Sequence, residues 1–326
     1  MTTPTINAET QPGLETIREA LQRIRPHIHR TPVMTSRTMN EMAGAQVFFK
    51  CENLQKGGAF KARGAINAVL SLDDAEAAKG VITHSSGNHG AALSMAARIR
   101  GIKAYIVVPS NAPAPKVGAI RNYGGEITFC KPTLEARESM TDELMARTGA
   151  VLIHPYNNYR VIAGQGTCAV EFHEQVEEGL DFLLAPVGGG GLISGTALAM
   201  KSLSPETWII GCEPKGADDA FQSKQAGKII LQAHPQTIAD GLRSSLGEKT
   251  FPVIHKLVDE IVTVSEDEII EAMRHIWERM KIVVEPSGAV AVAAAIFKKI
   301  AGFANRRIGI ILSGGNVDLD HLPFKK

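Results

Sequence analysis

Four glycine-rich segments hold the groups of this chain whose type and spacing could do chemistry. The longest glycine run lies in residues 186–195, PVGGGGLISG, where Gly188, Gly189, Gly190 and Gly191 follow an apolar run and precede a helical one. Because no side chain intervenes, successive backbone N–H groups there can converge on a phosphate, and the positive end of the following helix adds attraction. A tight strand-to-helix turn is the alternative interpretation. The segment has neither the Gly-Lys-Ser/Thr of a P-loop nor the spacing of a dinucleotide fingerprint.

The second segment, residues 56–65, KGGAFKARGA, contains a lysine that could act as a nucleophile. Lys61 lies where a glycine-rich turn becomes a helix. In a desolvated cleft its ammonium form is disfavoured, so the neutral, nucleophilic amine that forms Schiff bases becomes accessible. Taken alone, a single lysine is more often a solvated surface charge.

The third and fourth segments add polar side chains after predicted strands. Residues 83–90, THSSGNHG, crowd serine, asparagine and backbone N–H groups at the start of a helix, which favours binding of an anion. The alternative is that Ser86 or Asn88 only caps that helix. Residues 311–316, ILSGGN, place Ser313 at the end of a strand, where an ordinary turn serine is also common.

Short apolar runs alternate with segments of helical period along the chain and would position these groups. Residues 104–108, AYIVV, and 308–312, IGIIL, are almost wholly apolar, which is typical of parallel strands buried on both faces. Ligands in open α/β sheets bind beyond the carboxyl ends of the strands, where the four segments fall. We therefore predict an α/β fold with two open parallel-sheet lobes covered by helices.

The length of the chain favours two domains, because 326 residues exceed what one simple core usually holds. We expect a large domain formed by residues 1–77 and 158–326 and a small, mobile domain formed by residues 78–157. No linker rich in proline, glycine or serine divides them cleanly.

Composition excludes several classes of function. The chain has 35 Lys+Arg against 34 Asp+Glu, so no long-range field favours nucleic acid or an anionic membrane surface. Its four cysteines are far apart and lack the paired spacing of zinc sites or redox dithiols, which indicates reduced thiols in the cytoplasm. We expect no membrane span and no secretory leader.

Taken together and in this order, the four segments resemble the tryptophan-synthase-β family of pyridoxal-phosphate enzymes, called fold type II. The resemblance covers nearly the whole chain. Within the family the chain is similar to the group of serine racemases and of serine, threonine and 3-hydroxyaspartate dehydratases. Two further signatures carry this likeness: HPYN at residues 154–157 and EPKGADD at residues 213–219.

The resemblance implies a role for each group in holding pyridoxal 5'-phosphate. Lys61 would hold the cofactor as a Schiff base, Asn88 would bond the ring hydroxyl, and Ser313 would face the pyridine nitrogen. Glu285 would lie near the ring. The phosphate would lie against Gly188, Gly189, Gly190 and Gly191. A neutral serine at the nitrogen does not hold the ring protonated, which moderates its strength as an electron sink.

The same resemblance implies the substrate contacts. Lys61 would remove the Cα proton on one face as general base, and Ser86 would lie on the opposite face. The implied substrate-binding residues are Ser85, Ser86, Gly87, Asn88, His89, Arg137, Asp240 and Ser244. For Arg137 a solvated position on its helix is the alternative.

A divalent cation is implied at Glu213, Ala217 and Asp219, because two carboxylates and a backbone carbonyl completed by water suit Mg²⁺, Mn²⁺ or Ca²⁺. The alternative is an acidic loop that caps the next helix. The resemblance also implies a homodimer with ATP as an activator between subunits, although the chain carries no nucleotide motif of its own.

The implied activity is interconversion of L- and D-serine, accompanied by β-elimination of serine to pyruvate and ammonia. The alternative is a threonine or threo-3-hydroxyaspartate ammonia-lyase with little racemisation. Many simple dehydratases of the family carry alanine in place of Ser86, which favours racemisation, although hydroxyaspartate dehydratases also carry this serine. Tyr156 replaces the asparagine of animal serine racemases, which leaves the preferred substrate open. A catalytically silent binding protein is disfavoured because Lys61, Ser86 and Ser313 are all present.

Overall fold

The computed structural model describes residues 10–324 and contains two β-sheets. The six-stranded sheet has the order β1 (Val33–Thr35), β2 (Gln46–Lys50), β10 (Arg307–Ile311), β7 (Phe182–Pro186), β8 (Trp208–Pro214), β9 (Glu260–Val264). All its neighbouring strands are parallel except β1, which pairs antiparallel with β2. The four-stranded sheet is wholly parallel, with the order β5 (Glu126–Cys130), β4 (Ala104–Pro109), β3 (Val81–His84), β6 (Val151–Leu152).

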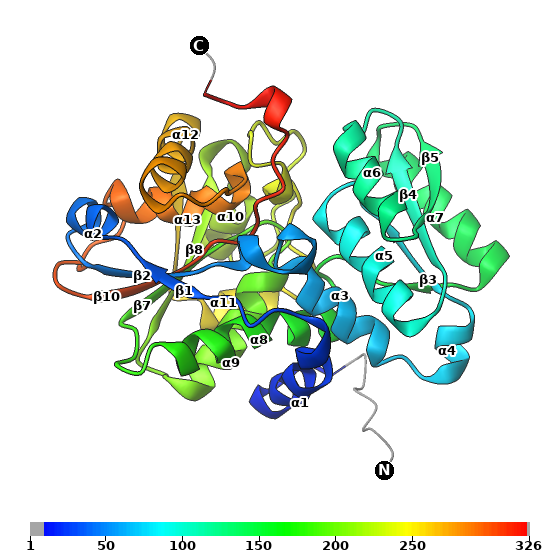
Figure 1. The fold of residues 1–326 in the computed structure, drawn as a ribbon, viewed down its shortest axis with the longest axis horizontal. Helices are drawn as coiled ribbons and strands as arrows, with labels where there is room; N and C mark the ends of the chain where they lie inside the picture. The colour runs from blue at the N-terminus through cyan, green and yellow to red at the C-terminus, as the bar shows by residue number, and fades with distance from the viewer. Residues whose placement is uncertain (1–9, 325–326) are drawn as a thin grey trace.

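Helices surround both sheets. The four-stranded sheet carries α5 (Asn88–Arg100), α6 (Ala114–Asn122) and α7 (Leu134–Thr148), and lies to the right in Figure 1. The six-stranded sheet has α1 (Leu14–Ile24), α8 (Tyr159–Gln175), α9 (Gly191–Leu203) and α11 (Phe251–Leu257) on one face. Its other face carries α2 (Arg37–Ala43), α12 (Glu266–His275) and α13 (Pro286–Ile296). The remaining helices are α3 (Lys61–Leu70), α4 (Asp74–Ala78) and α10 (Asp219–Ala226).

Alternate side chains of the central strands enter opposite cores. Leu184 and Ile310 pack into the cluster under α13, whereas Leu183 and Ile311 pack into the cluster under α8 and α9. All four are fully buried, which explains why these runs are apolar throughout. The predicted α/β fold with parallel sheets covered by helices is confirmed.

The two sheets divide the chain unevenly. The four-stranded sheet uses only strands between residues 81 and 152, inside the range expected for the small domain. The boundaries at 77/78 and 157/158 stay a prediction. Helix α3 packs against α5 on one side and α8 on the other, so it joins the two halves. None of the helices described in residues 10–324 is long and apolar enough to cross a membrane.

A buried cluster of four charges holds α3 in place. The Arg63 guanidinium donates to both carboxylate oxygens of Glu52 at 2.7 and 2.8 Å, and to both of Glu171 at 3.0 and 2.7 Å. Lys50 donates to Glu171 at 2.8 Å. All four side chains are buried, and the bonds to Arg63 hold the pKa of Glu52 below its usual value despite its burial. The cluster therefore ties α3 to β2 and α8 through fully paired charges.

Replacing Arg63 by methionine should lower the free energy of unfolding by about 3–5 kcal/mol, because the buried Glu52 carboxylate loses its cation and Glu171 keeps only Lys50. Urea unfolding of the cofactor-free protein, followed by circular dichroism, measures the change. Arg30→Met is the matched control, because Arg30 pairs with Glu174 at 3.3 Å on the surface and should cost less than about 1 kcal/mol. If both variants lost the same free energy of unfolding, the buried cluster would be no more stabilising than a surface ion pair, which would contradict this prediction.

Candidate active site

The four glycines form a loop between β7 and α9, as predicted. All four are buried. Among residues 10–324, nothing accepts a hydrogen bond from the N–H groups of Gly188, Gly189 and Gly190. Buried N–H groups are nearly always paired in folded proteins, so donors left free at a helix N-terminus fit an anionic ligand.

The same loop has no room for side chains. A Cβ on Gly189 would lie 2.2 Å from the ring of Tyr156, and one on Gly188 would lie 3.0 Å from the carbonyl oxygen of Gly241. Gly190 has φ +89° and would meet Ile254 at 2.6 Å. The glycines are therefore required by close packing, and the free donors fit the phosphate of pyridoxal phosphate.

Lys61 is the first residue of α3 and follows a turn in which Gly57 and Gly58 both have positive φ. Its Nζ donates to the carbonyl oxygen of Pro155 at 3.0 Å. Burial lowers the pKa of Lys61 to about 8, and the nearby Glu285 carboxylate opposes this shift. A lysine with this pKa has a substantial neutral fraction near physiological pH, as a nucleophile or base requires.

Asn88 and Glu285 meet although they belong to different halves of the fold. The side-chain amide of Asn88 donates to Glu285 Oε1 at 2.8 Å, and its oxygen accepts from Asn316 at 2.9 Å. Burial raises the pKa of Glu285 to about 8, with a further rise from Asp240. Asp240 forms an ion pair with Lys116 of α6. The predicted residues Asn88, Glu285 and Asp240 are therefore close neighbours.

Ser313 follows β10 and lies beside the start of α3. Its carbonyl oxygen accepts from the N–H of Phe60 at 3.0 Å, one residue before Lys61. Its hydroxyl contacts the carbonyl oxygen of Ser287 at 3.5 Å. The next residue, Gly314, is so close to Glu285 that a Cβ there would lie 2.4 Å from the carboxylate. Ser313 thus lies in the same cluster as Lys61 and Glu285.

Residues 85–89 join β3 to α5. Ser85 Oγ accepts from the N–H of Gly87 at 3.4 Å, whereas the half-buried Ser86 hydroxyl makes no hydrogen bond to any other described residue. The His89 ring is buried and its Nε2 donates to the carbonyl of Ile153 at 2.9 Å. Burial, followed by the charge of Lys61, lowers the pKa of His89 to about 3, so the ring stays neutral. The predicted role of residues 85–89 in binding a substrate carboxylate stays a prediction.

Arg137 and Ser244 approach the site around Tyr156. Burial raises the pKa of Tyr156, and Ser244 lies close enough to its hydroxyl to oppose that rise. The charge of Arg137 lies close enough to Tyr156 and His84 to lower the pKa of each, although burial has the larger effect in both. Among the described residues, the side chain of Arg137 hydrogen-bonds only the carbonyl oxygen of Thr133.

Several residues of this site were not predicted from the sequence as contacts. They are Lys116, Asn316 and the carbonyl group of Pro155. Asn316 could have been found, because it ends the quoted segment SGGN, but Lys116 and Pro155 carry no local signal. Pro155 contributes a backbone oxygen, which no sequence pattern reveals.

Glu213 and Asp219 lie at the end of β8 and the start of α10. Burial raises the pKa of both carboxyl groups, that of Asp219 to about 7. Asp219 Oδ1 is buried without a partner, while Glu213 accepts from the N–H groups of Ala220 and Phe221. Within residues 10–324, no three His, Cys, Asp or Glu side chains gather as a metal site, so a cation here needs the Ala217 carbonyl and water. Glu213 also satisfies helix donors, as the capping alternative requires.

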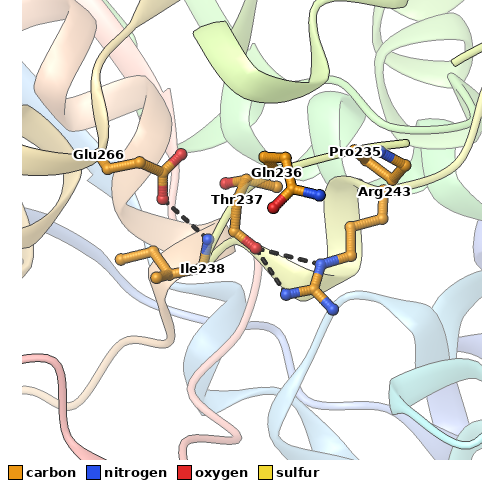
Figure 2. Close-up of a pocket in the computed structure, with 6 residues that line it drawn as sticks. All are labelled: Pro235, Gln236, Thr237, Ile238, Arg243 and Glu266. Atoms are coloured by element: carbon orange, nitrogen blue, oxygen red, sulfur yellow. Dashed lines mark hydrogen bonds between the residues drawn. The ribbon is translucent and has the colours of Figure 1, made fainter. Parts of the chain in front are cut away.

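A cavity of about 470 Å³ lies beside this cluster and is lined by Pro235, Gln236, Thr237, Ile238, Arg243 and Glu266 (Figure 2). Its charged side chains are engaged with the backbone. Arg243 donates to the carbonyl of Thr237 at 2.6 and 3.1 Å, and Glu266 accepts from Ile238 at 2.8 Å. These bonds hold the turn that precedes Asp240.

Comparison with known proteins agrees with this geometry. A family model described as "Pyridoxal-phosphate dependent enzyme" matches residues 24–314. A serine racemase of Arabidopsis thaliana is 57% identical over 94% of this chain and 93% of its own. A beta-hydroxyaspartate dehydratase of Paracoccus denitrificans is 53% identical over 96% and 99%. The structure of maize serine racemase has a TM-score of 0.93 at 51% identity and covers 95% of each chain. The chain therefore belongs to the pyridoxal-phosphate dependent enzyme family, and its cofactor is pyridoxal phosphate.

Proposed function

We propose that this enzyme interconverts L- and D-serine and also eliminates the β-hydroxyl of serine to give pyruvate and ammonia. Two observations carry the proposal, one on Lys61 at the start of α3 and one on Ser86 before α5. Lys61 has an amine that is partly neutral, and Ser86 has a hydroxyl free of hydrogen bonds within the described chain. The serine racemases among the relatives support the same activity.

Bound pyridoxal phosphate supplies an electron sink for the negative charge that develops at the substrate Cα. Lys61 takes the Cα proton from one face and holds it on Nζ, close to the Pro155 carbonyl. Ser86 then gives its hydroxyl proton to the opposite face, which yields the mirror-image amino acid. If the β-hydroxyl leaves first as water, the released enamine hydrolyses to pyruvate and ammonia.

The remaining residues orient the two reactants. Gly188, Gly189, Gly190 and Gly191 would hold the cofactor phosphate, with Asn88, Glu285 and Ser313 around its ring. The N-terminus of α5, from Ser85 to His89, would receive the substrate carboxylate. Arg137, Asp240 and Ser244 would line the substrate side chain. Residues 78–157 would act as the small domain that closes the site.

A second candidate activity is dehydration of threo-3-hydroxyaspartate. Arg137 is half-buried near Tyr156 and forms no ion pair with any carboxylate of residues 10–324, so its guanidinium suits a second substrate carboxylate. The 53% identical dehydratase supports this alternative. Threonine as a substrate is supported by a threonine deaminase structure at 42% identity and TM-score 0.89.

We further propose a divalent cation at Glu213, Ala217 and Asp219, where the unpartnered Asp219 Oδ1 supports a ligand. A homodimer, activation by ATP and a cytoplasmic location complete the proposal, and the likeness to serine racemases supports them. The near-neutral charge of the chain gives no support to a nucleic-acid or membrane partner.

Incubation with L-serine tests the activity. The wild-type enzyme should produce D-serine and pyruvate, and Ser86→Ala should lower D-serine formation at least about 100-fold while pyruvate formation continues, because only the second proton donor is lost. Chiral chromatography measures D-serine and a coupled dehydrogenase assay measures pyruvate. L-threonine and both threo-3-hydroxyaspartate enantiomers are tested in parallel. Absence of D-serine from the wild-type reaction would leave only the dehydratase alternatives.

Attachment of the cofactor to the cofactor-free protein should depend on pH through Lys61. The lowered pKa of about 8 means that the amine is protonated below pH 8 and neutral above it. The attachment rate should therefore rise about tenfold per pH unit below pH 8 and level off above it. Stopped-flow absorbance in the visible band follows the rate, with Lys61→Ala as the control. A rate that still rises at pH 10 would contradict the lowered pKa.

Added Mg²⁺ or Ca²⁺ should raise the melting temperature of the metal-stripped protein by about 5 °C at saturation, because the cation binds only the folded state. Asp219→Asn should abolish the rise. Asp218→Asn should preserve it, because the Asp218 side chain accepts instead from Gln222 on the surface. Equal shifts in both variants would favour the capping interpretation.

A further inference from the structure

Thr250 occupies a helix-capping position without capping its helix. It is the residue before α11, where a threonine hydroxyl usually accepts from an N–H of the first turn. Here the hydroxyl makes no such bond. The side chain is fully buried, so its hydrogen bonds must be made to other parts of the protein.

The Thr250 hydroxyl contacts the glycine loop instead. Its Oγ1 accepts from the N–H of Gly247 at 2.9 Å and donates its proton to the carbonyl oxygen of Gly189 at 2.8 Å, which is closer than the carbonyl oxygen of Gly247 at 3.1 Å. The turn that carries it is itself fixed, because the N–H of Lys249 donates to Asn157 Oδ1 at 2.8 Å. Asn157 also packs so closely on Gly247 that a Cβ there would lie 2.5 Å away. The hydroxyl is therefore held rigidly against the loop.

The bond to the Gly189 carbonyl also orients the next N–H group. In a trans peptide the C=O and the following N–H point in opposite directions. Holding the Gly189 oxygen toward Thr250 therefore directs the Gly190 N–H to the other side of the loop. Glycines on both sides of this peptide permit rotations that other residues resist, so the loop alone does not set this direction.

We propose that Thr250 is a positioning residue that aims the Gly190 N–H at the cofactor phosphate and thereby sets affinity for the phosphate group. The inference rests on the proposed role of Gly188, Gly189, Gly190 and Gly191. It assigns to Thr250 an effect on the phosphate of the ligand and none on its ring. Loss of a residue needed only for folding would instead lower the affinity for pyridoxal 5'-phosphate and for pyridoxal by the same factor.

The test compares two ligands that differ only in the phosphate. Dissociation constants of pyridoxal 5'-phosphate and of pyridoxal are measured by absorbance titration of cofactor-free protein. In Thr250→Val the preference for the phosphorylated ligand should fall about tenfold or more, as expected for one hydrogen bond to a charged group. Thr250→Ser keeps the hydroxyl and should retain the wild-type preference. If the valine variant does not fold, Thr250→Ala provides the same loss of the hydroxyl.

Thr207→Val is the matched control. Thr207 is also fully buried and its hydroxyl donates to the carbonyl of Leu180 at 2.7 Å, but this lies at the opposite end of β7 from the glycine loop. This variant should lose stability without losing the preference for phosphate. The inference would be overturned if Thr250→Val kept the wild-type preference for the phosphorylated ligand. This includes the case in which its affinities for pyridoxal 5'-phosphate and pyridoxal fall by the same factor.

Gly190→Ala separates failure of this inference from failure of the proposed phosphate site. If Gly190→Ala removes the preference and Thr250→Val does not, the glycine loop holds the phosphate without help from Thr250. If neither variant changes it, the phosphate lies elsewhere and both proposals are wrong.

Discussion

The paired carboxylates around Arg63 are the interaction on which the site depends most. Arg63 and Lys61 lie two residues apart in the first turn of α3, so their side chains leave the helix on nearly opposite sides. The Arg63 side is fixed by four hydrogen bonds, two to the carboxylate of Glu52 and two to that of Glu171. Because this anchor is buried and fully paired, α3 cannot rotate without exposing unpaired charge. The position of the Lys61 amine follows from that constraint.

Around this fixed amine, burial favours the neutral form of three titratable groups. It lowers the pKa of His154 to about 4 and that of His89 to about 3, and it raises the pKa of Glu285 to about 8. Few fixed charges therefore compete with an incoming phosphate or carboxylate for the backbone donors. In the proposed site, the cofactor phosphate and the substrate α-carboxylate would be bound through N–H groups at helix ends, where the helix dipole adds attraction.

The sequence allowed the fold class and the local parts of the site to be predicted, because each part carries its own signal. Glycine runs after apolar strands indicated the loop before α9 and the turn before Lys61. Contacts between distant segments gave no such signal. Asn88 and Glu285 are 197 residues apart, and Lys116 and Asp240 are 124 apart. Such pairs depend on how α5 and α6 approach the larger sheet, which residue patterns do not encode locally.

The position of β10 has a consequence for how the protein forms. This strand comes last in the chain but lies between β2 and β7, in the middle of the six-stranded sheet. During synthesis, the edges of β2 and β7 that pair with β10 therefore stay unpaired until residues 307–311 emerge from the ribosome. The four strands between residues 81 and 152 can pair much earlier. Ser313 follows β10 directly. The cofactor pocket can thus be completed only after Ser313 has been translated, and until then the nascent chain exposes strand edges that favour aggregation.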